Sequence, residues 1–367
     1  MKFLFSTILF ALFAAPLASA QTGGHVRKAE VQKTVRAETE REVEREAETA
    51  ADEGFAPEQH VGAAADVAVS LCVASGDVVV RGWDRLDVQA SASESGVVRL
   101  DAGGGTPARR VEVVVAEDKD ASPFAGGCGS TGTLELMVPR GASVSIQARD
   151  GHVEIAEVAD AHVQSLSGDV DIRRASRSVE VSCLSGDISV EDSSGPVRLA
   201  AVSGNIEARN VRTVAQGDNF EAKSTSGDVT LEGVAHSQVS GATVSGGVLY
   251  TGALARGGIY NFQTISGDVT LELPADSSFS VHAKVVAGGD IVTDFPVKSS
   301  SVTNTSTQTD AQSWPMPPPP PDGRKPGKVK SPKDKNGSET RLDGTVGTGD
   351  AVLNLSSFNG SLRLKRQ

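Results

Sequence analysis

The sequence has few aromatic residues, which argues against an ordinary globular core. Aromatic side chains account for 4% of the 367 residues, with 2 Trp, 2 Tyr and 11 Phe. Compact cores usually depend on aromatic residues for buried area. A coil of thin repeated layers can do without them, because each layer needs only a few small aliphatic side chains. We therefore expect one layered body rather than two globular domains.

The chain also lacks a long apolar stretch and an excess of positive charge. After residue 20, no run approaches the ~18 apolar positions that a membrane-spanning helix needs. The formal net charge is −12 at pH 7. Acidic chains repel nucleic acid and anionic membrane surfaces. We therefore predict no nucleic-acid partner and no transmembrane span.

Signatures of common catalytic and cofactor sites are absent from the sequence. It has no phosphate-binding loop, no dinucleotide fingerprint and no Ser/His/Asp arrangement. The histidines do not have the spacing of metal ligands. They are His25, His60, His152, His162, His236 and His282. We predict no catalytic residue, no cofactor and no metal, and we expect the protein not to be an enzyme.

Residues 1–20 form a predicted signal peptide. Lys2 supplies a positive start, Phe3 to Leu17 is apolar, and Ala18-Ser19-Ala20 offers small residues for cleavage. We expect cleavage between Ala20 and Gln21. The mature protein is then exported, and periplasmic, cell-surface and secreted locations all stay open.

Residues 21–60 have the composition of a charged helical or disordered spacer. Opposite charges three residues apart, as at Glu38/Arg41 and Arg45/Glu48, support a helix weakly. The apolar positions are few and small, so they form no continuous seam for a partner helix. We expect a short charged helix ahead of the folded body.

The most regular feature is a repeated Ser-Gly-Asp tripeptide, which occurs five times. From Gly168 the glycines of the tripeptide and its variants follow at steps of 18, 18, 23, 19 and 21 residues. Such a period is typical of stacked supersecondary units. After each glycine, apolar and polar residues alternate, as in Val170-Asp171-Ile172, which indicates a strand with one buried face. We predict an all-β fold over residues 61–296, a parallel β-solenoid or β-helix with rungs of ~18–21 residues and two strands per rung.

The tripeptide itself suits a tight corner between two strands. Glycine takes the positive φ of a sharp turn at no steric cost, and the flanking Ser, Asp or Asn can accept hydrogen bonds from turn N–H groups. The predicted corner residues are Gly76, Gly168, Asp169, Gly186, Asp187, Gly204, Asn205, Gly227, Asp228, Gly246, Gly267 and Asp268.

Two functional interpretations of the repeat stay open. The stacked acids could bind calcium, but calcium-binding coils pair Gly-Gly-x-Gly-x-Asp units that this chain lacks. An exported β-helix could also be a polysaccharide lyase or hydrolase, which needs clustered acids on one face. The outward positions here are mixed in sign, and aromatic platforms for sugars are scarce. Turn formation explains the corners best.

Residues 297–340 interrupt the strand pattern. A Ser/Thr tract precedes the run Pro317–Pro321 and several lysines, a composition that cannot form a core. We predict a disordered insertion here. Alternation returns in Leu353-Asn354-Leu355, so residues 341–367 are expected to supply C-terminal strands that complete the last rungs of the coil.

The three cysteines cannot all pair within one chain. An exported protein can form disulfides. Cys72 has the opposite parity from the apolar residues of its strand, and Cys128 lies in a glycine-rich loop that can fold over that face. Cys183 shares the parity of Val179 and Val181, as a buried small apolar residue would. We predict a Cys72–Cys128 disulfide and a free Cys183.

Three segments resemble a known family. The stretch from Val78 to Val88 resembles the first hairpin of the bacterial putative-adhesin family, a domain of unknown function. Residues 138–142, Val-Pro-Arg-Gly-Ala, are similar to the start of that family's repeats, and residues 359–364 are similar to its last strand. The resemblance covers about residues 61–296 and 341–367.

The resemblance implies a right-handed β-solenoid, exported or on the envelope, akin to the heads of autotransporter adhesins. It supplies no catalytic residue. We therefore expect a non-catalytic, adhesin-like binding or envelope-scaffold protein whose partner is an unknown surface or envelope ligand. The alternatives are a fibre subunit that self-associates end to end and a β-helix polysaccharide lyase or hydrolase.

The cysteine assignment can be tested by counting thiols. Native protein should show no freely reactive thiol, because two cysteines are paired and Cys183 is buried. Denaturation without reductant should expose one. Two reactive thiols in the native protein would rule the assignment out.

Overall fold

The computed structural model describes residues 57–93, 96–116, 128–305 and 339–367. They all belong to one compact unit, Phe55–Gln367. The predicted signal peptide with its cleavage site at Ala20 and Gln21, and the predicted charged helix, lie outside the described residues. Residues 58–60 of the predicted spacer form the start of the first strand.

The described residues form strands, and none of them lies in a helix that could cross a membrane. The first group is β1 (Glu58–Trp83), β2 (Asp87–Ala92), β3 (Val97–Ala102), β4 (Ala108–Ala116) and β5 (Gly129–Pro139). Longer strands then alternate with shorter ones. The longer ones are β6 (Ser143–Ala148), β8 (Asp160–Ser167), β10 (Ser178–Ser185), β12 (Val197–Ser203), β14 (Asn219–Ser226), β16 (Gln238–Ser245) and β18 (Ile259–Ser266). The shorter ones are β7 (Val153–Ala156), β9 (Val170–Arg173), β11 (Ile188–Glu191), β13 (Ile206–Arg209), β15 (Val229–Glu232), β17 (Val248–Thr251) and β19 (Val269–Leu273). The last group is β20 (Phe279–Val285), β21 (Ile291–Thr293), β22 (Lys298–Thr305), β23 (Glu339–Val346), β24 (Ala351–Asn359) and β25 (Leu362–Arg366).

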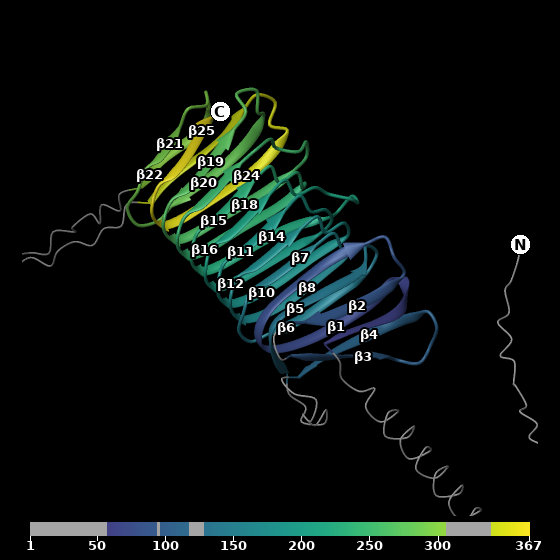
Figure 1. The fold of residues 1–367 in the computed structure, drawn as a ribbon. Coiled ribbons are helices and arrows are strands. Elements are labelled where there is room, and N and C mark those ends of the chain that lie inside the picture. The colour runs from purple at the N-terminus through teal and green to yellow at the C-terminus, as the bar shows by residue number, and fades with distance from the viewer. Residues whose placement is uncertain (1–56, 94–95, 117–127, 306–338) are drawn as a thin grey trace, which may run out of the picture. The chain divides into compact units, whose positions relative to one another are not determined.

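Successive rungs stack with their strands parallel and in register (Figure 1). The longer strand β10 pairs with β8 and β12, and the shorter strand β11 pairs with β9 and β13. Val181 thus lies beside Val163 and Leu199. Parallel neighbours cannot be joined by a hairpin, so the chain winds round an axis. The all-β, solenoid-like fold expected from the repeat is confirmed.

The core is a stack of small aliphatic side chains, as the shortage of aromatic residues led us to expect. Within β10, Val179 and Val181 are buried while Glu180 and Ser182 are exposed. Some of the few aromatic residues in the core contact one another between neighbouring rungs. The ring centroids of Tyr250 on β17 and Tyr260 on β18 are 5.6 Å apart. Such edge contacts add to the burial of the rings.

Glycine is required at the predicted corners because neighbouring rungs approach too closely for a side chain. Gly204 has a φ of 149°, and a Cβ placed on it would lie 1.9 Å from the carbonyl oxygen of Gly186. Gly227 stands in the same relation to Gly204, with a φ of 147° and a distance of 2.1 Å. The repeated glycine therefore serves the stacking of rungs as well as the turn.

The acidic and amide side chains of the corners bond across rungs rather than within one turn. The backbone N–H of Asp187 donates to Oδ1 of Asp169 at 2.8 Å, and that of Asn205 donates to Oδ1 of Asp187 at 2.7 Å. The N–H of Asp228 continues the series onto Oδ1 of Asn205 at 2.9 Å. Each side chain thus satisfies an N–H group of the next rung.

A second row of hydrogen bonds runs just inside the same corners. The hydroxyl groups of Ser224, Thr243 and Thr264 each donate to the glycine carbonyl oxygen of the preceding rung at 2.9 Å. The buried thiol of Cys183 occupies the equivalent position and lies 3.5 Å from the carbonyl oxygen of Gly168. Cys183 therefore acts as a weak member of a hydroxyl row.

A further corner joins each shorter strand to the next longer one, as two strands per rung require, but the sequence repeat did not identify the residues that turn there. Four residues there have a left-handed backbone without being glycine. They are Glu157, Arg174, Asp192 and Asn210, with φ between 50° and 61°. Between these corners and the longer strands lies a short side without regular strand, where Ser194 bridges to Arg212 and Arg212 to Ala235.

Cys72 and Cys128 form a disulfide in the structure, with Cα atoms 4.8 Å apart. The bond links the outward side of β1 to the residue just before β5, across a sequence separation of 56 residues. Cys183 is buried and free.

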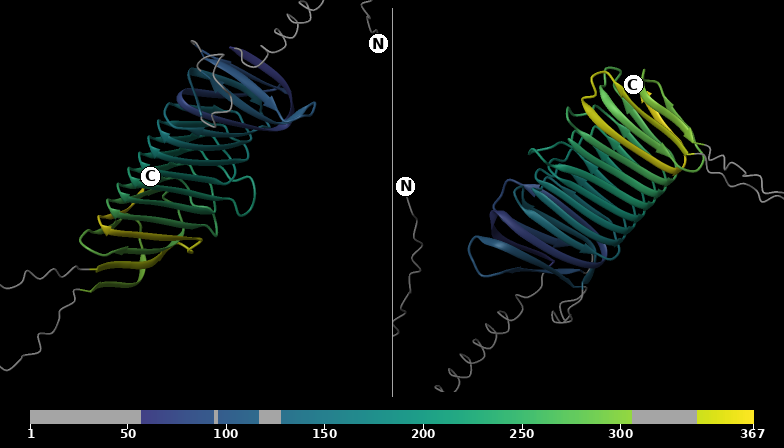
Figure 2. Two further views of the ribbon diagram at one scale, coloured as in Figure 1. Left: turned by 90° about the horizontal axis from the view of Figure 1, so that it is seen from below. Right: turned by 180° about the vertical axis from the view of Figure 1, so that it is seen from behind.

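The C-terminal strands form an internal rung and not the last one. β24 lies between β18 and β20, and β25 lies between β19 and β21, so the yellow strands sit among green ones (Figure 2). β23 closes this end by pairing antiparallel with both β20 and β22. β22 and the first residues of β23 fall at the two ends of the predicted insertion 297–340, and residues 306–338 between them lie outside the described part.

The close approach of the corners can be tested with alanine substitutions. Gly227→Ala should lower the free energy of unfolding by about 1–3 kcal/mol more than Gly217→Ala, because overpacking against a backbone carbonyl adds to the φ strain. Gly217 is the matched control, since it has a φ of 97° but no atom within 4 Å of the position that a Cβ would take. Equal losses in urea unfolding would contradict the steric explanation.

Candidate functional site

The outward side chains of the longer strands form one continuous surface, which we call the outer face. It crosses β8, β10, β12, β14, β16, β18, β24 and β20 in that spatial order, each strand paired with the next. Because the strands are in register, every outward position repeats as a row running across the strands. Three such rows can be followed.

The row nearest the glycine corners is apolar, and we call it the apolar row. It consists of Leu166, Leu184, Val202, Thr225, Val244, Ile265, Phe358 and Val286. The six apolar side chains other than the half-buried Val286 are 41–52% exposed, and Thr225 is exposed as well. Scattered exposed apolar residues are normal, but here apolar residues occupy seven of eight neighbouring positions in one row. Arg149 follows beyond Leu166 and ends the row.

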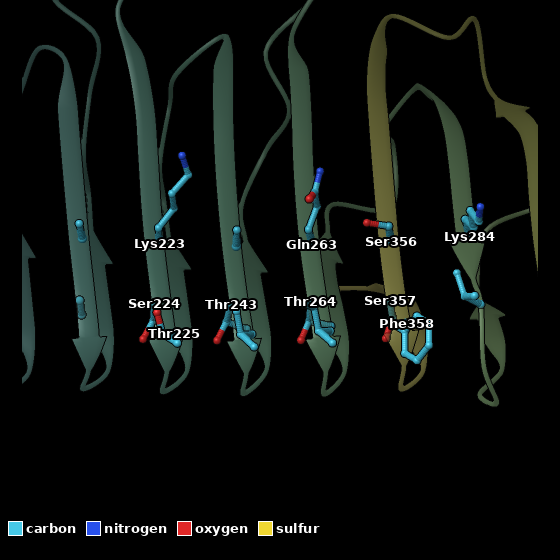
Figure 3. Close-up of a pocket in the computed structure, with 16 residues that line it drawn as sticks. Lys223, Ser224, Thr225, Thr243, Gln263, Thr264, Lys284, Ser356, Ser357 and Phe358 are labelled. Carbon is cyan, nitrogen blue, oxygen red and sulfur yellow. The ribbon is translucent and has the colours of Figure 1, made fainter.

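The next row, which we call the central row, is lined by small and polar side chains. It consists of Gln164, Ser182, Ala200, Lys223, Ala242, Gln263, Ser356 and Lys284. A shallow groove of about 700 Å³ follows the central and apolar rows from β12 to β20. Figure 3 shows Lys223, Gln263, Ser356 and Lys284 in line along it, with Phe358 at its apolar border. Phe358 comes from the C-terminal strand β24, which is the next-to-last strand of this border.

The third row is polar and internally paired. His162 lies 3.3 Å from Glu180, and Arg198 lies 3.3 Å from Glu221. Further along, the side-chain amide of Asn354 donates to Oδ1 of Asn261 at 2.8 Å. The outer face therefore changes from apolar at the glycine corners to polar at the opposite border.

The outward face of the shorter strands has a different character. Arg209 contacts Glu191 at 3.1 Å and Glu232 at 3.4 Å, and Arg173 contacts Glu154 at 3.6 Å and Glu191 at 3.5 Å. These side chains are mostly more than a third exposed, so each pair contributes little to stability. The mixed charges expected for a solvated sheet face lie here, already paired with one another.

One carboxylate near the start of the longer strands is strongly perturbed. Asp160 accepts hydrogen bonds from Arg177 and from the hydroxyl groups of Ser143 and Ser178, the last two at 2.6 Å. Burial opposes ionisation, but these bonds prevail and lower the pKa of Asp160 to about 2. All of its partners are protein groups, so the cluster ties three successive rungs together.

The predicted corner residues come together in a single row along the coil. Their side-chain oxygens already accept backbone N–H groups, for example that of Gly247 on Oδ1 of Asp228 at 2.7 Å and that of Ser361 on Oδ1 of Asp268 at 2.7 Å. In the part of the chain that the structure describes, no three His, Cys, Asp or Glu side chains are grouped as metal ligands. These corner side chains therefore join neighbouring rungs through hydrogen bonds to backbone N–H groups.

His236 is the one histidine that the core encloses among those described. Its Nε2–H donates to the carbonyl oxygen of Gly195 at 2.8 Å, which leaves Nδ1 unprotonated and without a hydrogen-bond partner in the described structure. Burial lowers the pKa of His236, and the Gly195 bond and the Asp218 carboxylate only partly oppose this.

The apolar row was missed by the sequence reasoning, although a signal for it exists. In most repeats the residue directly before Ser-Gly is apolar, as at Leu184, Val202 and Ile265. Parity assigns that residue to the outside of the strand, where an apolar side chain is unexpected.

Comparison with known proteins gives one family and one solved structure. A family model described as Toastrack DUF4097 matches residues 68–313, which is more than half of the chain. The chain matches no curated protein. A similar solved structure is described as a "putative cell adhesion protein" from Clostridium sporogenes ATCC 15579; it has 10% sequence identity and a TM-score of 0.20, and the match covers 84% of this chain and 99% of that chain.

The buried histidine predicts a loss of stability in acid. The unfolded chain takes up a proton on His236 near pH 6.5, whereas the folded chain resists it until lower pH. Stability attributable to His236 is therefore complete above pH 6.5 and declines below it, by up to about 1.4 kcal/mol at pH 5.5. Urea unfolding at pH 7.5 and 5.5 measures the difference, which His236→Asn should reduce and the exposed control His60→Asn should not. A pH dependence that His236→Asn leaves unchanged would contradict this assignment.

Proposed function

We propose that this chain, which belongs to the Toastrack DUF4097 family, is a non-catalytic, adhesin-like or envelope-scaffold protein. Its outer face is the proposed binding surface. The family resemblance seen in the sequence supports the adhesin-like role. The predicted signal peptide supports export to the envelope or beyond. The right-handed sense of the coil is part of this proposal.

The apolar row carries the proposal. Outward positions of a sheet in water are ordinarily polar, as most of them are on the shorter strands of this chain. Exposed Leu, Val, Ile and Phe side chains in neighbouring rungs leave apolar area in contact with water, at a cost of roughly 25 cal/mol per Å². A partner that covers the row recovers this free energy.

A non-catalytic role is supported by the use of the charged groups. The corner acids accept N–H groups of the next rung, and the arginines of the shorter strands pair with neighbouring glutamates. A glycoside hydrolase needs two carboxyl groups held at a set separation around a substrate. Acids already engaged in the stacking of rungs are poorly suited to that task.

End-to-end self-association is a second candidate. Among the described strands, β22 pairs with β23 alone, so its other edge offers free backbone groups. Such an edge can template pairing with another chain.

A glycan array combined with a turnover assay tests the proposed function. Full-length labelled protein should be retained on envelope-type glycans and should release no product from pectins or polyuronates. Ile265→Lys on the apolar row should lower retention at least ten-fold, and Thr230→Lys on the shorter strands should not. Product release from any of these polymers, or equal retention of the two variants, would overturn the proposal.

A further inference from the structure

We propose that the apolar row binds the apolar row of a second copy of this chain, so that two coils lie side by side. This rests on the proposed function in one respect, namely that the outer face is a binding surface. It adds the identity of one partner.

The spacing of the row selects this partner. Its side chains repeat once per strand, at about 4.8 Å. Side chains on one face of an α-helix recur at about 5.4 Å, and those on one face of an extended strand at about 6.7 Å. Over eight strands the side chains of a helix or of an extended strand therefore lose their alignment with the side chains of the row. Another coil of the same kind repeats at the same spacing and stays in step over the whole length.

The size of the face sets the strength of the association. Eight strands span about 34 Å, and the strip from the central row across the apolar row to the glycine corners spans about 13 Å. The contact is therefore close to 450 Å² per copy, or about 900 Å² in total. Stable interfaces bury more than this, and weak or transient ones bury about this much. We expect a reversible dimer that forms at micromolar or higher concentration.

Charge decides between the two ways of placing the copies about a two-fold axis. An axis along the strands would bring the acidic corners of both copies together. An axis along the coils sets the strands antiparallel and places the central row of one copy over the corners of the other. Lys223 then faces Asp228 of the second copy, and Lys284 faces Asp290, because each pair belongs to the same rung. Within its own chain Lys223 also pairs with Glu221, and Lys284 lies 3.3 Å from Glu339, so each lysine would lie between two acids. Arg149 faces Arg149 of the second copy, a like-charge contact, but this contact lies at the end of the row and has Asp150 beside it.

This arrangement makes each residue of the apolar row face its own equivalent. Ile265 lies opposite Ile265, and Val202 lies opposite Val202. In the other arrangement Ile265 would lie opposite Val202. The two can therefore be separated by cross-linking through introduced cysteines.

The experiment is sedimentation velocity on the full-length chain from 1 to 200 μM (about the range for weak interfaces), followed by oxidative cross-linking. The wild type should show a monomer–dimer equilibrium, Ile265→Lys and Val244→Lys should each weaken it at least ten-fold, and Thr230→Lys should leave it unchanged. Under mild oxidation Ile265→Cys should form covalent dimers and Thr230→Cys should not. Unchanged melting temperatures would show that all variants are folded.

A wild type that stays monomeric at every concentration overturns the proposed dimer and leaves the proposed function, which the glycan array tests, standing. A dimer that binds no glycan overturns that function and leaves the proposal standing. Cross-links that require mixing Ile265→Cys with Val202→Cys would overturn the stated orientation. Equal weakening by Thr230→Lys would overturn the assignment of the contact to the apolar row.

Discussion

The close contact of backbone with backbone at the glycine corners governs the rest of this structure. The carbonyl oxygen of Gly186 occupies the space where Gly204 would carry a side chain. Rungs can therefore stack at strand spacing through the turns as well as through the strands. This fixes the register of the strands, and with it the alignment of every inward and outward position into rows.

Alignment into rows gives the two outward faces their separate characters. On the shorter strands, Arg209 and Glu191 belong to a line of opposite charges that neutralise one another. On the longer strands the same alignment places Leu184, Val202 and Ile265 in one row of apolar side chains that are exposed to water. Because equivalent positions of successive rungs are in register, a preference for apolar residues at one position of the repeat produces an apolar row along the coil.

The sequence was sufficient to predict the coil, its two strands per rung and the glycine corners, because the stacking contact can be met only by glycine. It implied a second corner in each rung but did not identify the residues that turn there, because Glu157 and Arg174 carry no compositional sign of a left-handed backbone. It placed the C-terminal strands in the coil but not between β18 and β20. Local patterns specify a rung, whereas the order of rungs depends on contacts between residues distant in the chain. The apolar row was readable in principle, but only once the outward face of each strand was known.

The internal position of the C-terminal rung separates the order of synthesis from the order in space. In a coil whose rungs stack in sequence order, each new rung could fold onto the preceding one as the chain is synthesised. Here the rung of β20 and β21 is made before the rung of β24 and β25 on which it rests. Assembly of this end, including the stretch of the groove formed by Ser356 and Phe358, therefore requires residues 351–366, which follow β20 and β21 in the chain. A product that ended before β24 would lack the layer between β18 and β20, so β20 would have no parallel neighbour on that side.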